Sequence, residues 1–179
     1  MRKCKFLSSP IYVDENDLLP YIDMQNAKFL ENFVKNTTYF NGLPIKVIHY
    51  NDQLNYGNLL NKGEYRNTSF AHIVSKQPNK NLKNRDIDVQ RLRTCHWVKE
   101  LIDIYNDIQL HRCNMCQGFY SKDLIENGRS VSYIFCSVVR YVIILEKHQD
   151  AYRQEFYIIK TAFYVNEESM YRGLMKKLV

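Results

Sequence analysis

Three runs of β-branched and aromatic residues in the C-terminal part of the sequence constrain the fold most. They span residues 131–136, 138–145 and 155–165. Such residues favour extended strands, because their side chains pack well on a pleated surface. Only the polar stretch 146–153 separates the last two runs, and a connection this short joins antiparallel neighbours in a hairpin. The C-terminal part is therefore predicted to form an antiparallel sheet.

The sequence before these runs favours helices, because its apolar residues recur every three or four positions. A hydroxyl or carboxylate side chain precedes two of these segments and can accept a bond from a helical N–H. The last segment has acids in its first turn and lysines in its last, the order that a helix dipole favours. We expect helices over 17–35, from 68 or 69 to 74, from 86 or 88 to 105 and over 167–178, with a β-rich run over 43–50.

This order of elements predicts an α+β fold, in which the N-terminal helices pack on one face of a roughly four-stranded antiparallel sheet. A length of 179 residues suits one domain with an N-terminal extension. We divide the chain into an accessory subdomain of helix and strand, 1–64, and a second domain, 65–179. The hydrophobic share of 45% excludes disordered, collagen-like and disulfide-scaffold classes.

The sequence predicts a cytoplasmic protein without membrane contact. No stretch approaches the roughly 18 to 20 consecutive apolar residues that span a bilayer. The N-terminal MRKCKFLSSP has too little apolar length for a secretory signal. Five cysteines, an odd number, favour reduced thiols over a disulfide framework.

The net charge of +6 is local. Residues 62–99 carry nine lysines and arginines against three acids, whereas 1–61 and 100–179 are each balanced. A concentrated basic segment attracts polyanions, of which nucleic acid is the commonest, although phospholipid or an acidic protein would satisfy the same charges. The alternative is a solvated loop or helix face.

Within and after the basic segment lie the residue types that a metal-free ribonuclease needs. Histidine suits proton transfer because its pKa is near neutrality, and His72 is the candidate. Arginine binds phosphate oxygens with its charged fork. Each residue also has a structural alternative: a satisfied helix histidine, a solvated helix face or an ordinary strand threonine. The candidate basic and hydroxyl residues are Arg85, Arg91, Arg93, Lys160 and Thr161.

A strand alternates its side chains between two faces, so Lys160 and Thr161 are expected on opposite faces of the last long strand. Only one of these two faces can line a catalytic cleft. Both residues have mainly apolar neighbours, where a polar group needs a partner. A bound phosphate would serve as that partner.

A zinc site is the second chemical possibility. Cys113 and Cys116 have the spacing of half a tetrahedral site, which Cys95-His96 or His111 could complete. A single pair with this spacing is weak evidence, and Cys95 lies on an apolar helix stripe where a buried thiol needs no ligand. We therefore predict unligated thiols and no metal.

The order of several motifs resembles the phage and mobile-element nucleases of the barnase/EndoU/colicin/RelE superfamily. The similarity covers about residues 65 to 178 and includes an arginine pair followed by a tryptophan and a strand that ends in Thr-Ala-aromatic. The segments 107–129 and 1–64 depart from the compact pattern of that superfamily. The matching motifs are Phe70-Ala-His72-Ile, Arg85 with Arg91-Leu and Trp97-Val, Tyr141-Val-Ile-Ile-Leu-Glu146 and Phe156-Tyr-Ile-Ile-Lys-Thr161-Ala-Phe-Tyr164.

The resemblance implies helices followed by a four-stranded antiparallel sheet, and RNA cleavage that needs no metal and leaves a cyclic phosphate. It implies His72 as general base or acid, Arg85 and Arg91 as phosphate ligands, and Thr161 as a donor to the scissile phosphate. Lys160 and Tyr164 are further candidates for substrate binding, and Arg93 follows from the basic segment. Members often serve as toxins or phage effectors.

The sequence thus predicts a cytoplasmic endoribonuclease that cleaves RNA, tRNA included, by attack of the 2′-hydroxyl and needs no cofactor. A protein inhibitor or antitoxin is an expected partner. The alternative is a non-catalytic module that binds nucleic acid or protein through the same basic segment, with or without a structural zinc.

Overall fold

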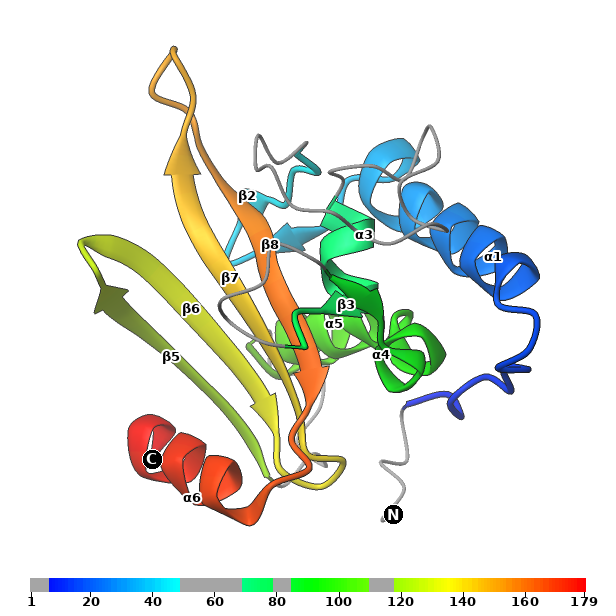
Figure 1. Cartoon of the computed structure of the whole chain (residues 1–179). Coiled ribbons are helices and arrows are strands. Elements are labelled where there is room, and N and C mark those ends of the chain that lie inside the picture. Colours follow the sequence, from blue (N-terminus) through cyan, green and yellow to red (C-terminus); the bar gives the residue numbers. More distant parts are fainter. Residues whose placement is uncertain (1–6, 49–68, 79–84, 110–117) are drawn as a thin grey trace.

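A computed structural model describes residues 7–48, 69–78, 85–109 and 118–179. Its centre is an antiparallel sheet of four strands in the order β5-β6-β7-β8 (Figure 1). The strands are β5 Phe119–Glu126, β6 Arg129–Cys136, β7 Tyr141–Gln149 and β8 Glu155–Tyr164. The predicted α+β class with a four-stranded antiparallel sheet is therefore confirmed.

The helices and two small β-ladders complete the described chain. Helix α1 continues directly into the π-helix η1, and β1 pairs with β2 and β3 with β4. The helices are α1 Leu19–Leu30, η1 Glu31–Lys35, α3 Ser69–Val74, α4 Val89–Thr94, α5 Trp97–Gln109 and α6 Glu168–Leu178. The short strands are β1 Tyr39–Phe40, β2 Leu43–Pro44, β3 Ser75–Lys76 and β4 Asp86–Ile87.

The single helix expected up to residue 105 is two helices, α4 and α5. Asp86 and Asp88 were the two predicted caps, and Asp88 is the one that caps α4. Its carboxylate accepts a hydrogen bond from Arg91 N at 3.2 Å. The helix ends at Thr94, whose hydroxyl donates to the carbonyl of Gln90 at 2.8 Å. Such bonds from side chain to backbone compete with regular helix geometry. The predicted apolar stripe is nevertheless buried across the break.

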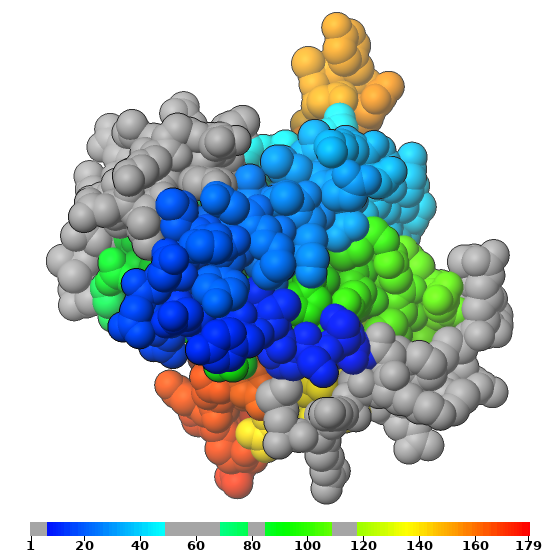
Figure 2. Space-filling model, turned by 90° about the vertical axis from the view of Figure 1, so that its right-hand side faces the viewer, coloured from blue at the N-terminus to red at the C-terminus, as the bar shows by residue number. Residues whose placement is uncertain are grey.

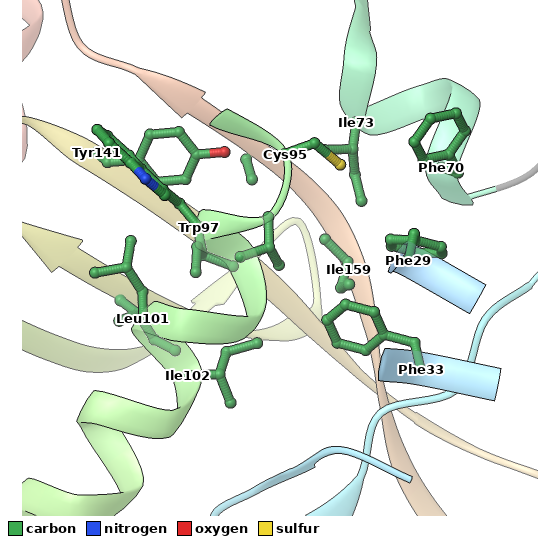
Figure 3. Close-up of a cluster of buried hydrophobic side chains, with 14 of the residues drawn as sticks. Phe29, Phe33, Phe70, Ile73, Cys95, Trp97, Leu101, Ile102, Tyr141 and Ile159 are labelled. Carbon is green, nitrogen blue, oxygen red and sulfur yellow. The ribbon is translucent and has the colours of Figure 1, made fainter. Parts of the chain in front are cut away.

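The main hydrophobic core lies between α1, α3, α4, α5 and one face of the sheet. Trp97 packs edge-on against Tyr141 of β7, with ring centroids 5.5 Å apart (Figure 3). Phe29 and Phe33 reach the same core near Ile159 of β8 (Figure 3). In Figure 2 the N-terminal residues, in blue, lie across the green helices on the side away from the sheet.

A smaller core lies on the opposite face of the sheet, under α6. It contains Phe135 of β6, Val142 of β7 and Leu178 of α6. Tyr171 of α6 packs edge-on against Phe135 with ring centroids 5.9 Å apart. The sheet is thus buried on both faces at the end near α6, and the two faces have different helical partners (Figure 1).

Strand β8 carries one extra residue relative to β7. Thr161 lies opposite Ile144, but Ile159 lies opposite Leu145, so Lys160 is an inserted bulge residue. Ile144 packs against the core under α6, so Thr161 belongs to that face. Lys160 bonds to Glu146 on the same face. The expectation that Lys160 and Thr161 lie on opposite faces is therefore wrong, because the bulge interrupts the alternation.

Strand β5 falls within the segment 107–129, which was not predicted to join the sheet. It pairs along its whole length with β6, from Phe119 opposite Cys136 to Glu126 opposite Arg129. Asn127 and Gly128 join the two strands with φ of 50° and 77°, the left-handed pair that a tight hairpin turn requires. The segment is therefore part of the main sheet.

Strand β7 and the hairpin turn are shifted from their expected positions. The polar stretch 146–153 was expected to be a connection, but β7 continues to Gln149. The turn follows at Asp150, whose carboxylate accepts bonds from Tyr152 N at 3.0 Å and Gln154 N at 2.9 Å. Figure 2 shows this tip projecting beyond the body of the molecule.

The N-terminal part shares the main core with the rest of the chain. Ile22, Phe29 and Phe33 belong to the same buried cluster as Trp97. Of the β-rich run 43–50, the structure describes β2 and a parallel bridge from Ile45 to Tyr157 of β8. The domain boundary between residues 64 and 65 lies outside the described residues and stays a prediction.

Gly118 offers a test of the turn that leads into β5. Its φ is 89°, and an added Cβ would lie 2.5 Å from the Ser137 hydroxyl oxygen. We expect Gly118→Ala to lower the free energy of unfolding by about 1–3 kcal/mol, the usual range for a strained backbone. Gly173→Ala, in open space within α6, should raise it by about 0.5–1 kcal/mol. Urea unfolding of both variants checks the prediction, and equal stabilities would contradict it.

Candidate active site

Arg85, predicted to bind substrate, is a buried structural clamp, only 6% exposed. Its Nε donates to Ser75 Oγ at 2.9 Å, and its Nη2 donates to the carbonyls of Ser75 at 2.7 Å and His72 at 3.0 Å. The guanidinium thus joins the end of α3 to β3. These three bonds go to the Ser75 hydroxyl and to two backbone carbonyls, so the guanidinium serves the local structure.

Arg91 and Arg93 also bind backbone carbonyls. Arg91 Nη1 donates to the carbonyl of Ser75 at 2.9 Å, and its guanidinium lies 5.3 Å above the ring of Phe163. Burial lowers the pKa of Arg91, against the opposing charge of Asp88. Arg93 Nε donates to the carbonyl of Ile11 at 3.2 Å, which fastens the N-terminal segment to α4. Of these two, Arg91 lines the cavity described below.

His72, predicted as the general acid or base, lies on α3 beside Arg85 and Arg91. Burial, reinforced by these two positive charges, lowers its pKa to about 3. At neutral pH the imidazole is therefore uncharged and holds no surplus proton to donate. A general base with so low a pKa would also be weak.

A cavity of about 350 Å³ brings together Arg91 and Tyr164 from the predicted set. It lies beside the C-terminal end of β8, between the start of α4 and the start of α6. Its charged groups include Lys76 and Asp88, which form an ion pair at 3.0 Å. The remaining lining residues are Gln90, Phe163, Asn166, Glu167 and Met170.

The other predicted residues are dispersed. Thr161 lies on the sheet face under α6, whereas the buried residues of α3 belong to the core on the other face. Lys160 points to a separate polar cluster on the α6 side. Four members of the basic segment lie outside the described residues: Lys62, Arg66, Lys80 and Lys83.

That polar cluster surrounds Glu146, whose side chain is 3% exposed. Glu146 Oε1 lies 2.9 Å from Arg129 Nη1 and 2.9 Å from His148 Nε2. Its second oxygen, Oε2, lies 3.1 Å from Lys160 Nζ. Three basic side chains, one each from β6, β7 and β8, therefore contact one buried carboxylate. We call these four residues the Glu146 cluster.

The strands themselves place the Glu146 cluster on one face. Glu146 lies opposite Val131, which belongs to the core under α6. His148 is two residues further along β7 and so points to the same face. Lys160 follows Ile159, which faces the main core, so its side chain points to the α6 face and contacts the same carboxylate. The cluster thus continues the α6 face toward the hairpin tip.

The basic side chains of the cluster are open to solvent although the carboxylate is not. The side-chain exposures are 66% for Arg129, 42% for Lys160 and 36% for His148. Burial raises the pKa of Glu146, but the bonds and charges of Lys160 and Arg129 outweigh burial, so that the pKa is lowered overall. Glu146 is therefore ionised at neutral pH, and its negative charge faces the positive charges of Arg129 and Lys160 and the imidazole of His148.

Aromatic and charged groups flank the Glu146 cluster on both sides. Toward the hairpin tip, the ring of Phe156 stacks on His148 with centroids 5.8 Å apart, and Lys46 Nζ lies 4.4 Å from the Phe156 ring centroid. On the other side, the Tyr133 hydroxyl donates to Glu126 at 2.8 Å, and Lys177 of α6 contacts both. Basic and aromatic groups thus continue beyond the cluster.

Sequence reasoning missed Glu146, His148 and Arg129. The stretch 146–153 was interpreted as a loop, so the two-residue spacing of Glu146 and His148, which puts both on one strand face, went unused. Arg129 follows Asn127-Gly128, a sequence typical of hairpin turns, which could have predicted that Arg129 begins a strand. Only Lys160 of this cluster was among the predicted residues.

Of the residues that could form the candidate zinc site, Cys95 and His96 lie within the described part of the chain. Cys95 is buried in the main core, and burial raises the pKa of its thiol to about 12. Cys113, Cys116 and His111 lie outside the described residues. His96 ring Nδ1 lies 3.1 Å from Gln25 Nε2. Within the described ranges, no three histidine, cysteine or acidic side chains gather as metal ligands do.

The depressed pKa of His72 predicts a pH dependence of stability. Because the unfolded chain takes up a proton near 6.5 and the folded chain only near 3, stability falls as the pH drops through this window. Between pH 7 and pH 5 the wild-type chain should lose about 2 kcal/mol more than His72→Gln. Urea unfolding at both pH values measures this difference, and parallel losses in the two proteins would contradict it.

No protein-family model matches the chain, and searches of curated proteins and of solved structures found no similar protein. In the described part of the chain, none of the helices is both long enough and apolar enough to cross a membrane. The chemistry of the Glu146 cluster and of the cavity beside β8 therefore carries the functional conclusion.

Proposed function

We propose that this chain is a metal-independent endoribonuclease and that the Glu146 cluster is its active site. The observation that carries the proposal is the three-to-one arrangement of exposed basic groups around one buried carboxylate. A buried carboxylate needs partners that offset its desolvation. Arg129 and Lys160 outnumber the single carboxylate even with a neutral His148, so the cluster carries a positive charge that faces solvent and suits a phosphodiester.

Cleavage of RNA by its own 2′-hydroxyl requires a base, an acid and positive charge around the phosphorus. Glu146 Oε1 lies 2.9 Å from His148 Nε2, a contact distance without hydrogen-bond geometry, and we assign proton uptake to the imidazole of His148. A carboxylate beside the ring restricts the position of such a histidine. Arg129 and Lys160 supply the positive charge that a metal ion would otherwise provide.

The proposed reaction is one transesterification. The imidazole of His148 takes the proton of the 2′-hydroxyl, O2′ bonds to phosphorus, and the bond from phosphorus to O5′ breaks. The ammonium of Lys160 gives a proton to the departing O5′, and Arg129 binds a non-bridging oxygen. The products are a 2′,3′-cyclic phosphate and a 5′-hydroxyl. Glu146 contacts both His148 and Lys160 and so holds base and acid in place.

The wider setting is part of the same proposal. RNA in the cytoplasm is the substrate, and an inhibitor or antitoxin protein is the partner that protects the host cell. The motif resemblance to the barnase/EndoU/colicin/RelE superfamily supports this activity. The position of the catalytic groups differs from the one that the resemblance implies, because His72 and Arg85 serve the packing of α3 and β3.

A cleavage assay with excess EDTA tests the proposal. We expect the full chain to cut single-stranded RNA or tRNA, and His148→Ala and Lys160→Ala to lower the rate by about 10²–10⁴-fold, the usual contribution of a general acid or base. Lys147→Ala is the matched control, because Lys147 neighbours the cluster in sequence but pairs with Glu155 at 2.7 Å. Its rate should equal that of wild type.

Two other outcomes would overturn this assignment. If both cluster variants keep full activity while His72→Ala and Arg91→Ala lose it, the active site lies in the basic segment 62–99 and not in the Glu146 cluster. Binding of RNA without cleavage under any condition would favour the non-catalytic binding module. Circular dichroism of each variant shows whether a loss of activity reflects a loss of fold.

A further inference from the structure

We propose that β5 pairs along its outer edge with β5 of a second copy of this chain, in antiparallel orientation. This inference does not rest on the proposed ribonuclease function. Strand β5 is the end strand of the main sheet, and within the described residues it pairs only with β6. An edge strand directs about half of its backbone N–H and C=O groups away from the sheet, where another strand can bind them.

The opposite edge of the sheet is already occupied by the chain itself. At β8, the backbone N–H of Lys46 donates to the carbonyl of Tyr157 at 2.8 Å, and Ile45 forms a parallel bridge to Tyr157. Helices α3 and α4 also contact β8. Among the described strands of the main sheet, β5 therefore offers the edge at which a second chain can add (Figure 1).

Strand β5 lacks most of the features that keep an edge strand from pairing. It has eight residues without proline, and its register against β6 is regular along the whole length. Its central charges are turned to the faces of the sheet. Lys122 Nζ donates to the carbonyl of Lys177 at 3.0 Å, and Asp123 accepts a bond from Ser132 Oγ at 2.5 Å. Ile125 is 74% exposed, so this long edge also carries apolar surface that a partner strand would cover.

Symmetry limits how two copies of β5 can pair. Two antiparallel copies are related by a two-fold axis perpendicular to the sheet, which keeps each side chain on its own face. Residues directly opposite each other must therefore belong to the same face. Registers centred on Lys122 or on Asp123 would place two like charges directly opposite each other, which is destabilising.

The register centred on Leu124 places opposite charges together. Lys122 then lies opposite the partner's Glu126, and symmetry repeats this pair on the other side of the axis. In the described chain Lys177 and Tyr133 both contact Oε1 of Glu126, so the partner's Lys122 would bind Oε2. The two Leu124 side chains meet at the axis. The charges of β5 thus select one register and disfavour its neighbours.

The paired strands would join the two four-stranded sheets into one continuous antiparallel sheet. Because the two-fold axis is perpendicular to the sheet, helix α6 of each copy lies on the same face of the joined sheet, and so does each Glu146 cluster. On the other face, the exposed Ile125 side chains of the two copies become diagonal neighbours.

Sedimentation velocity of the full chain over a range of concentrations tests the inference. We expect a dimer that dissociates on dilution. Lys122→Glu should raise its dissociation constant about tenfold, because two ion pairs become two pairs of like charges. The matched control is Lys28→Glu, the same change of charge on α1, which lies across the main core from β5 (Figure 1). This control should dimerise like wild type.

Two further measurements keep the inference falsifiable. Adding Glu126→Lys to Lys122→Glu exchanges the two charges and should restore most of the lost affinity, and circular dichroism shows whether each variant is folded. In the wild-type chain, the backbone amides of 119–126 should exchange hydrogen more slowly at high protein concentration than at low. A chain that stays monomeric, a dimer that Lys122→Glu leaves unchanged, or a folded double variant without recovered affinity would overturn the inference.

Discussion

The extra residue in β8, Lys160, determines which side chains of this strand pack into each of the two hydrophobic cores. Before the bulge, Tyr157 and Ile159 face the core formed with α3 and α5, and after it Ala162 and Tyr164 return to that same core. Uninterrupted alternation would have put Ala162 and Lys160 on one face. Lys160 follows Ile159 and so lies on the α6 side, where its ammonium reaches Glu146, and the extra residue returns Ala162 to the main core. The bulge thus allows Lys160 to face one side while Ile159 and Ala162 both face the other.

The unequal lengths of helix and strand create the open part of the sheet. Helix α6 has 11 residues and spans about 16 Å, whereas β8 has 10 residues and spans about 33 Å. The helix therefore leaves part of the face uncovered. Where the apolar core under α6 ends, the next inward position of β7 is Glu146. A buried carboxylate is costly without partners, so the fold requires basic residues there. Their outer atoms remain accessible to a ligand.

Local patterns predicted some of these features and not others. The apolar stripe of α4 and α5, the Asp88 cap and the C-terminal helix follow from interactions within a few residues, and all are present. The bulge at Lys160 could not be predicted from local patterns. Its position depends on how β8 packs against two cores on opposite faces of the sheet. Strand β5 was missed because Lys122 and Asp123 interrupt its apolar character. Its pairing with β6 supplies the stabilisation that its own composition does not.

The distribution of charge explains why the predicted phosphate-binding residues and the candidate active site lie apart. An excess of basic residues along a segment counts charges without regard to their partners. Arg85, Arg91 and Arg93 bind the carbonyls of Ser75 and Ile11, so their guanidinium groups serve the packing of α3, β3 and the N-terminal segment. Residues 100–179 are balanced in total, yet they gather three basic side chains on one buried carboxylate and expose them. An anion responds to accessible local charge, which tertiary structure determines and net charge does not.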